Sequence, residues 1–206
     1  MLRIWGRGNS INVQKVLWCC AELELPFERV DAGMEFGVVD TPAYRALNPN
    51  GRVPTIEDDG YVLWESNVIV RYLAAKHGAG TLYPGDLRAR FDAERWMDWQ
   101  QTSLGPPVRD VFWALVRTPP EKRDETALRK AREDAERALA ILDAHLAGRR
   151  FVGGESFTMG DIPVGISVYR WFAFDIARAE RPNLARWYER LTTRPGFREH
   201  IMLPLT

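Results

Sequence analysis

Polar residues gather at the points where the sequence indicates that one structural element passes into the next. In the stretch "LRIWGRGNSINVQKV" an apolar run ends at Gly6 and a helical pattern begins at Ile11, with Ser10 and Asn12 at the joint. The start of a helix collects free backbone N–H groups and the positive end of the helix dipole, so it stabilises a thiolate or a carboxylate. The alternative is that Ser10 or Asn12 simply caps the helix, a role that both residue types favour.

Two further stretches, "NPNGRVPT" and "LWESNVIV", also place polar groups that could bind a ligand where one element passes into the next. A cis bond before Pro54 would expose the backbone N–H and C=O of Val53 to an extended peptide ligand, which would pair with them like an added strand; a trans proline at a strand start is the simpler alternative. Glu65 would hold an ammonium group and Ser66 a carboxylate at the start of the next helix. The alternative for this pair is again helix capping.

The remaining polar clusters favour structural roles. Thr158 and Asp161 stand three residues apart before an apolar run, which is the spacing of a capping box with Asp in place of Glu. Cys19 and Cys20 are adjacent, cannot act as a CxxC pair, and are predicted to be reduced core thiols. The three histidines have no ligand partner at helical spacing, so the sequence predicts no metal site.

The elements that must position these residues follow from periodicity and from Pro/Gly punctuation. We expect an α/β unit in residues 1–78, a linker in 79–87, and an all-α unit in 88–206. In the first unit the predicted order is strand, helix, strand, helix, strand, strand, helix, at residues 2–6, 11–23, 27–31, 42–47, the two β-rich runs of "VPTIEDDGYVLW", and 65–76.

Composition limits the classes of partner. The chain has 206 residues with 28 Lys+Arg against 28 Asp+Glu, so no global nucleic-acid or membrane-surface footprint is expected. Its apolar runs are shorter than the roughly 20 residues of a membrane helix, and its N-terminus lacks the pattern of a signal peptide. We therefore expect a cytoplasmic protein.

The order of these motifs resembles that of the cytosolic glutathione transferases, and the resemblance covers nearly the whole chain. It is carried by the helix-one serine in "WGRGNSINVQKVL", then "NPNGRVP", "LWESNVIVRYLA", "TMGDI" and "RPNLARWYERLTTRPGF". Bacterial members of the family have the most similar pattern. The resemblance implies a thioredoxin-like N-terminal domain, an α-helical C-terminal domain, a homodimer, and glutathione as co-substrate in a detoxification reaction.

The resemblance also assigns roles to residues. Ser10 matches the family's hydroxyl at the start of helix one, and Asn12 an asparagine that some bacterial members use near the sulfur. Pro54 matches the cis proline, and Val53 the residue whose backbone pairs with the cysteinyl unit. Glu65 and Ser66 match the pair that holds the γ-glutamyl amine and carboxylate.

Two departures from the family pattern affect the expected chemistry. Asp40 stands where members often carry His, Gln or Lys for the glycyl carboxylate, which it would repel, so Arg52 is expected to hold that group. Position 10 is not cysteine, which disfavours disulfide-exchange chemistry. The "SSC" run of the isomerase branch is absent as well.

We therefore expect glutathione thiolate, held by Ser10 and assisted by Asn12, to attack a small electrophilic carbon and displace a leaving group such as a halide. The pocket for this electrophile is expected on the helix around Trp96 to Leu104 and on "RDVFWALVR", with Arg109, Phe112 and Trp113 as candidates beside Arg117. The alternative is a non-catalytic binding or protein-interaction module of the same fold.

Overall fold

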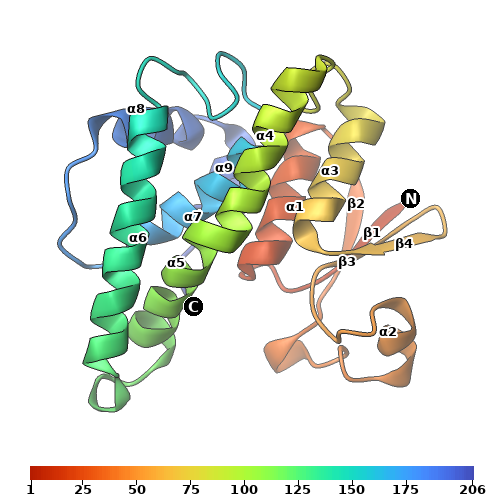
Figure 1. Ribbon diagram of the computed structural model, residues 1–206. Coiled ribbons are helices and arrows are strands. Elements are labelled where there is room, and N and C mark those ends of the chain that lie inside the picture. The colour runs from red at the N-terminus through yellow and green to blue at the C-terminus, as the bar shows by residue number, and fades with distance from the viewer.

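The computed structural model describes all residues, Met1–Thr206, and the order of elements in the first 78 residues is the predicted one (Figure 1). Boundaries differ from the predicted ones by one or two residues. The elements are β1 (Leu2–Trp5), α1 (Ile11–Glu22), β2 (Phe27–Val30), α2 (Pro42–Leu47), β3 (Thr55–Asp58), β4 (Tyr61–Trp64) and α3 (Ser66–His77).

The four strands form one mixed sheet in the order β2-β1-β3-β4. β1 is parallel to β2 and antiparallel to β3, and β3 and β4 form a hairpin. Asp59 and Gly60 make the two-residue turn of this hairpin with positive φ at both positions, as such turns require. Helices α1 and α3 lie side by side on one face of the sheet, while α2 lies on the opposite side (Figure 1).

Strand register brings the three polar joints to one end of the sheet. Trp5 at the end of β1 is paired with Thr55 at the start of β3, and Thr55 is paired with Trp64 at the end of β4. One end of the sheet therefore carries three connections: the segment after β1, the residues before β3 and the residues after β4. This pairing collects Ser10, Val53 and Glu65 from distant parts of the sequence.

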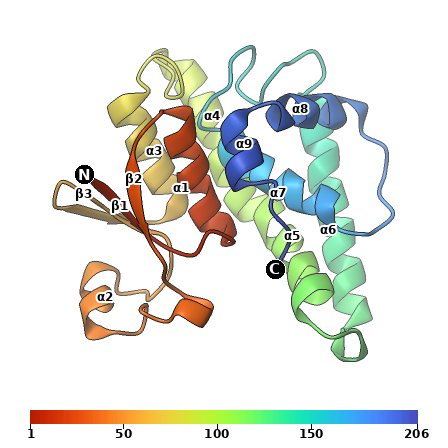
Figure 2. The same cartoon turned by 180° about the vertical axis from the view of Figure 1, so that it is seen from behind.

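The second half of the chain is helical and contains no β-strand (Figure 2). Its helices are α4 (Leu87–Trp99), α5 (Gly105–Phe112), α6 (Glu125–His145), α7 (Asp161–Ala173), α8 (Pro182–Thr192) and α9 (Pro195–His200). Two π-helical segments, Gln100–Leu104 and Trp113–Arg117, follow α4 and α5, and the first of them interrupts the helix that was expected around Trp96 to Leu104. None of the helices combines the length and the apolar character that a membrane crossing needs.

Helix α1 joins the two halves through a continuous hydrophobic core of 42 buried residues. Trp18 of α1 stacks edge-on against Phe197 of α9, with the ring centroids 4.9 Å apart. Gly165 and Gly196 allow this approach, because a Cβ at either position would come within 3.1 Å of the Trp18 ring. Cys19 and Cys20 on the same helix are buried and form no disulfide.

The Thr158–Asp161 pair forms half of the predicted capping box. The Asp161 carboxylate accepts the backbone N–H of Thr158 at 2.9 Å, but the backbone N–H of Asp161 binds the Thr158 carbonyl instead of its hydroxyl. Helix α7 begins at Asp161 itself, with Gly160 in the capping position. The buried carboxylate also accepts N–H groups from Val152 and Trp187, so it ties α7 to α8 and to the preceding loop.

Candidate active site

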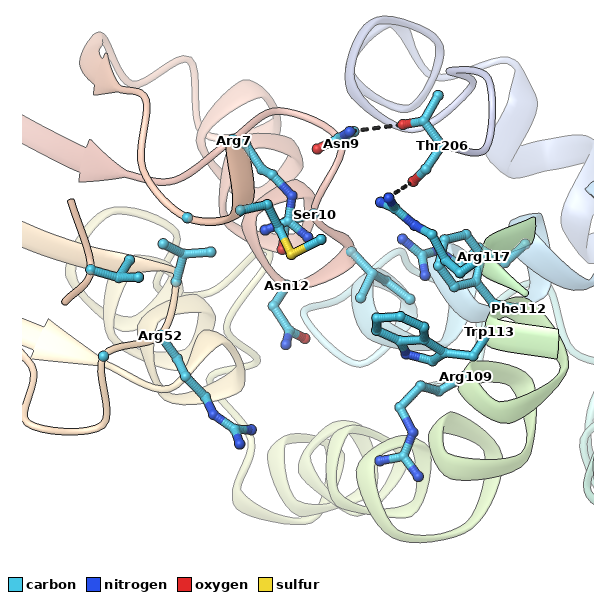
Figure 3. Close-up of a pocket in the computed structure, with 17 residues that line it drawn as sticks. Arg7, Asn9, Ser10, Asn12, Arg52, Arg109, Phe112, Trp113, Arg117 and Thr206 are labelled. Carbon is cyan, nitrogen blue, oxygen red and sulfur yellow. Dashed lines mark hydrogen bonds between the residues drawn. The ribbon is translucent and has the colours of Figure 1, made fainter. Parts of the chain in front are cut away.

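The end of the sheet that collects the polar joints opens into a cavity of about 510 Å³ between the two halves of the chain (Figure 3). This volume lies in the range of small-molecule sites. Figure 3 shows Arg7, Ser10 and Arg52 on one side and Arg109, Trp113 and Arg117 on the other. Seven of the predicted site residues line the cavity, namely Ser10, Asn12, Arg52, Val53, Arg109, Phe112 and Trp113.

Ser10 occupies the N-cap position of α1, but its side chain makes no capping hydrogen bond. Its backbone carbonyl accepts the N–H of Gln14 at 2.9 Å, which completes the first turn and leaves the hydroxyl available at the cavity wall. The carboxamide oxygen of Asn12 accepts a hydrogen bond from the Ser66 hydroxyl at 3.3 Å. The capping alternative for Ser10 is therefore wrong at the level of its side chain.

The Val53–Pro54 peptide bond is cis, as the family resemblance implied. Hydrogen bonds fix the preceding residue, since the Arg52 carbonyl accepts the Tyr44 hydroxyl at 2.7 Å and the Asn48 carboxamide at 2.9 Å. The N–H and C=O of Val53 make no hydrogen bond within the chain. This backbone edge is available to an extended peptide. Pro54 is buried behind it and does not line the cavity.

Glu65 and Ser66 lie in an adjoining cavity of about 200 Å³. Four residues line both cavities, namely Ile11, Asn12, Arg109 and Arg170. Glu65 has φ 73° and ψ 108°, a conformation that is strained for a residue with a side chain and that often occurs at functional sites. Its carboxylate makes no ion pair and caps no helix, which removes the capping alternative for this residue as well.

Lys15 lines this second cavity and was missed by the sequence analysis. Its ammonium group contacts the Ser66 hydroxyl at 3.4 Å and the Gln100 carboxamide oxygen at 3.3 Å, and the residue is 4% exposed. Burial lowers the pKa of Lys15 to about 7, the negative charge of Glu65 opposes this shift, and Arg170 adds to it. Gln100 donates in turn to the Ser167 hydroxyl at 3.0 Å.

Arginine residues dominate the larger cavity. Arg7, Arg52, Arg109, Arg117 and Arg170 line it, and no Asp or Glu side chain does. The Arg170 guanidinium is buried and stacks 4.3 Å from the centre of the Phe112 ring. Burial first, and then the charges of Arg7 and Arg117, lower the pKa of Arg170 to about 10.

The sequence placed Arg109 and Arg117 near the electrophile pocket, but Arg7 and Arg170 escaped notice. Arg7 lies in the loop that precedes Ser10, so its position in the sequence could have indicated that it lies near the site. Arg170 lies in an apolar helix, where sequence alone does not reveal whether a charged side chain faces a cavity. Trp96 and Leu104 lie in the hydrophobic core, whereas Gln100 and Gln101 between them line the smaller cavity.

Asp40 does not line the cavity; its side chain is 83% exposed and pairs with Arg45 at 2.7 Å. Arg45 offsets the charge that was expected to repel a glycyl carboxylate. Val39 borders the cavity beside it, and the exposed Arg52 lines the same wall.

Comparisons with known proteins agree with the geometry. The family described as "Glutathione S-transferase, N-terminal domain" matches residues 9–76, and "Glutathione S-transferase, C-terminal domain" matches residues 106–195. Glutathione S-transferase GstB of Escherichia coli (strain K12) is 44% identical over 208 residues, covering 100% of both chains. The theta class glutathione S-transferase of Xanthomonas axonopodis pv. citri, solved with glutathione bound, superposes with a TM-score of 0.96 at 47% identity, over 100% of this chain and 99% of that chain.

Proposed function

The chain belongs to the glutathione S-transferase family, and we propose that it transfers glutathione to a small electrophile that carries a negative charge. Glutathione is the co-substrate, and the thioredoxin-like half with its helical partner is the fold that the family uses. The availability of the Ser10 hydroxyl and the Glu65 carboxylate favours a catalytic role over that of a binding or interaction module.

In the proposed complex the tripeptide extends along the edge of the sheet. Glu65 receives the γ-glutamyl ammonium group and Ser66 the γ-glutamyl carboxylate, while Val53 pairs with the cysteinyl backbone. Arg52 attracts the glycyl carboxylate. These placements are supported by three groups at the same end of the sheet: the carboxylate of Glu65, the unpaired backbone N–H and C=O of Val53, and the positive charge of Arg52.

The reaction we propose is a direct displacement. The glutathione thiol releases its proton to solvent, and the Ser10 hydroxyl together with the N-terminus of α1 stabilises the thiolate, with Asn12 assisting. The thiolate forms a bond to the electrophilic carbon while the bond to the leaving group breaks, and the leaving group departs as an anion such as a halide. No covalent enzyme intermediate is required.

The negative charge proposed for the electrophile is inferred from the arginine side chains that line the larger cavity. Five arginine side chains line the cavity without an acidic side chain among them. Arg117 donates one N–H to the Thr206 oxygen at 2.7 Å (Figure 3), and the Nε atoms of Arg7, Arg117 and Arg170 have no hydrogen-bond partner. Glutathione's glycyl carboxylate accounts for one cation at most. A carboxylate on the electrophile would supply the negative charge that the lining of this cavity lacks.

A matched pair of substrates tests this proposal. We expect chloroacetate to be turned over with a higher kcat/KM than chloroacetamide, which has the more reactive carbon but no charge, when rates are corrected for the uncatalysed reaction. Arg117→Gln should reduce kcat/KM for the acid about 10-fold or more and leave the amide nearly unaffected, because the lost contact is charge-assisted.

Lys122→Gln serves as the control, because that exposed cation lies outside both cavities. An enzyme that uses the neutral amide as well as the acid, with equal sensitivity to Arg117→Gln, would contradict the anionic substrate. An enzyme that is not retained on glutathione resin and uses neither compound would contradict the transferase reaction itself.

We also propose that the protein is a homodimer in the cytoplasm, where glutathione is kept reduced. The proposed dimer face is the apolar surface formed by Trp64, Val68, Leu87 and Phe91. These side chains are 37%, 42%, 60% and 60% exposed and lie on β4, α3 and α4. Ion pairs from Arg71 to Glu94 and Asp98 hold α3 against α4.

A further inference from the structure

We propose that Lys15 is the cation that binds the α-carboxylate of the γ-glutamyl residue, and that it takes up a proton when glutathione binds. This inference rests on the proposed binding of glutathione at Glu65 and Ser66, and it assigns a binding role to a residue to which the sequence analysis gave none. The starting observation is that Lys15 is 4% exposed, lines the cavity, and bonds through its ammonium group only to the neutral oxygens of Ser66 and Gln100, with no carboxylate at ion-pair distance.

Buried charges in proteins are normally paired with an opposite charge. The contacts of Lys15 are instead two neutral oxygens at 3.3 and 3.4 Å, which leaves one of its three N–H donors unused. An ammonium group in this setting is poorly compensated. A ligand anion at Ser66 would therefore meet a cation that the protein itself leaves without a counter-ion.

The charges around Lys15 define what such a ligand must be. The charged side chains that line its cavity are Glu65, Arg109 and Arg170, and the polar ones on the neighbouring π-helical segment, Gln100 and Gln101, are neutral. Glu65 is the acceptor for the ligand's ammonium group. Lys15 and Ser66 then form the adjacent donor pair for the carboxylate on the same carbon atom, which suits an α-amino acid end group.

Binding of this carboxylate changes the protonation of Lys15. In the free protein the pKa of Lys15 is about 7, so near neutral pH a large fraction of the molecules carry the neutral amine. An adjacent anion favours the charged form and raises this pKa. The complex therefore holds more protons than the free protein above about pH 7.

Calorimetry with S-methylglutathione tests the inference, because this ligand has no thiol that could ionise and release a proton. Binding enthalpies measured in two buffers with different ionisation enthalpies give the number of protons taken up. We expect uptake to be near zero at about pH 5.5 and to approach most of one proton at about pH 8. The affinity of the wild type for S-methylglutathione should fall as the pH rises. Over the upper part of this range the dissociation constant should increase by up to about tenfold per pH unit.

The variant Lys15→Met removes the charge while keeping an unbranched chain of similar length. We expect it to abolish the proton uptake and to weaken S-methylglutathione binding about 10- to 100-fold at pH 6.5, where the lysine is mostly charged. Lys122→Met, which changes an exposed lysine outside both cavities, is the control and should leave both quantities unchanged.

A second ligand separates a binding role from a structural one. The S-methyl derivative of γ-aminobutyryl-cysteinylglycine keeps the ammonium group and lacks only the α-carboxylate. Wild type and Lys15→Met should bind it with equal affinity and without proton uptake. This result would also show that the variant is folded.

Two results together would overturn the role of Lys15 and leave the transferase function intact. The wild type would bind S-methylglutathione without proton uptake, and Lys15→Met would lose affinity equally for both ligands. Wild type that binds neither S-methylglutathione nor glutathione would overturn the proposed function and this inference with it.

Discussion

The Ser10 hydroxyl is the side chain on which the proposed thiolate depends most directly. It faces the cavity without a capping bond, at the positive end of α1. In Ser10→Ala we expect the pKa of the bound glutathione thiol to rise by about one to two units, since a charge-assisted hydrogen bond contributes roughly 1.5–3 kcal/mol. The ultraviolet absorbance of bound thiolate, titrated against pH, measures this shift.

Ser10→Thr is the matched control, because it keeps the hydroxyl and should retain a low thiol pKa. If the bound thiol has the same pKa in wild type and in Ser10→Ala, Asn12 and the backbone N–H groups of α1 must stabilise the thiolate instead. Asn12→Ala would then be expected to show the shift.

Lys15 also makes a prediction about stability in the absence of ligand. Between pH 7 and 10.5 the folded protein binds fewer protons at this site than the unfolded chain, whose lysine keeps its ordinary pKa of 10.5. The unfolding free energy therefore rises with pH in this window, and the wild type should gain about 2 kcal/mol relative to Lys15→Met between pH 7 and 9. Denaturant unfolding at each pH measures the difference; a constant difference would show that Lys15 keeps its ordinary pKa when folded.

Sequence reasoning was strongest for residues at the joints of elements and weakest for residues inside helices. Ser10, Val53 and Glu65 stand where a turn and a helical pattern meet, so their surroundings can be inferred locally. Lys15 lies in the first half of α1 and Arg170 in the last turn of α7, both inside helices rich in apolar residues. Whether such a side chain faces solvent or a cavity depends on which other helix packs against it, and a single sequence does not contain that information.

At the scale of elements, the start of α7 depends on one carboxylate. Asp161 is buried and accepts hydrogen bonds from Val152, Thr158 and Trp187, each at 2.9 Å; burial raises its pKa to about 6 against the effect of these bonds. In Asp161→Asn an amide N–H₂ must face one of these N–H donors. We expect a loss of about 2–4 kcal/mol in unfolding free energy at pH 7.5, measured by denaturant titration.

Asp124→Asn provides the comparison for this experiment. Asp124 caps α6 at an exposed position through the N–H groups of Thr126 and Ala127, and asparagine caps a helix as well as aspartate does. Its unfolding free energy should stay near that of the wild type. Equal effects of the two substitutions would mean that the network around Asp161 contributes nothing beyond capping.

The elements themselves were largely predictable, and the exceptions have a physical cause. The two β-rich runs on either side of Glu57 to Gly60 indicated the hairpin, and its register in the structure places Thr55 between Trp5 and Trp64. The π-helical segments could not be predicted, because no residue type marks them. The first of them lies beside the smaller cavity and brings Gln100 within hydrogen-bond distance of Lys15.

At the scale of the whole molecule, the proposed dimer depends on the apolar surface of Trp64, Val68, Leu87 and Phe91. Placing a charge on it by Phe91→Glu should shift the protein from dimer to monomer in sedimentation velocity at low micromolar concentration, because burial of an unpaired carboxylate opposes association. Ile141→Glu is the control, since Ile141 is 57% exposed on α6, outside this surface. A wild type that sediments as a monomer would contradict the dimer.

The proposed reaction brings an electrophilic carbon close to a thiolate, so the protein's own thiols must not react with the same substrate. Cys19 and Cys20 lie on the same helix as Ser10, less than three turns away. Burial raises the pKa of Cys20 to about 12 and that of Cys19 well above its usual value, so both remain thiols, and the close-packed core denies them contact with an electrophile. Burial of both thiols would therefore protect the enzyme from alkylation by the electrophile proposed as its substrate.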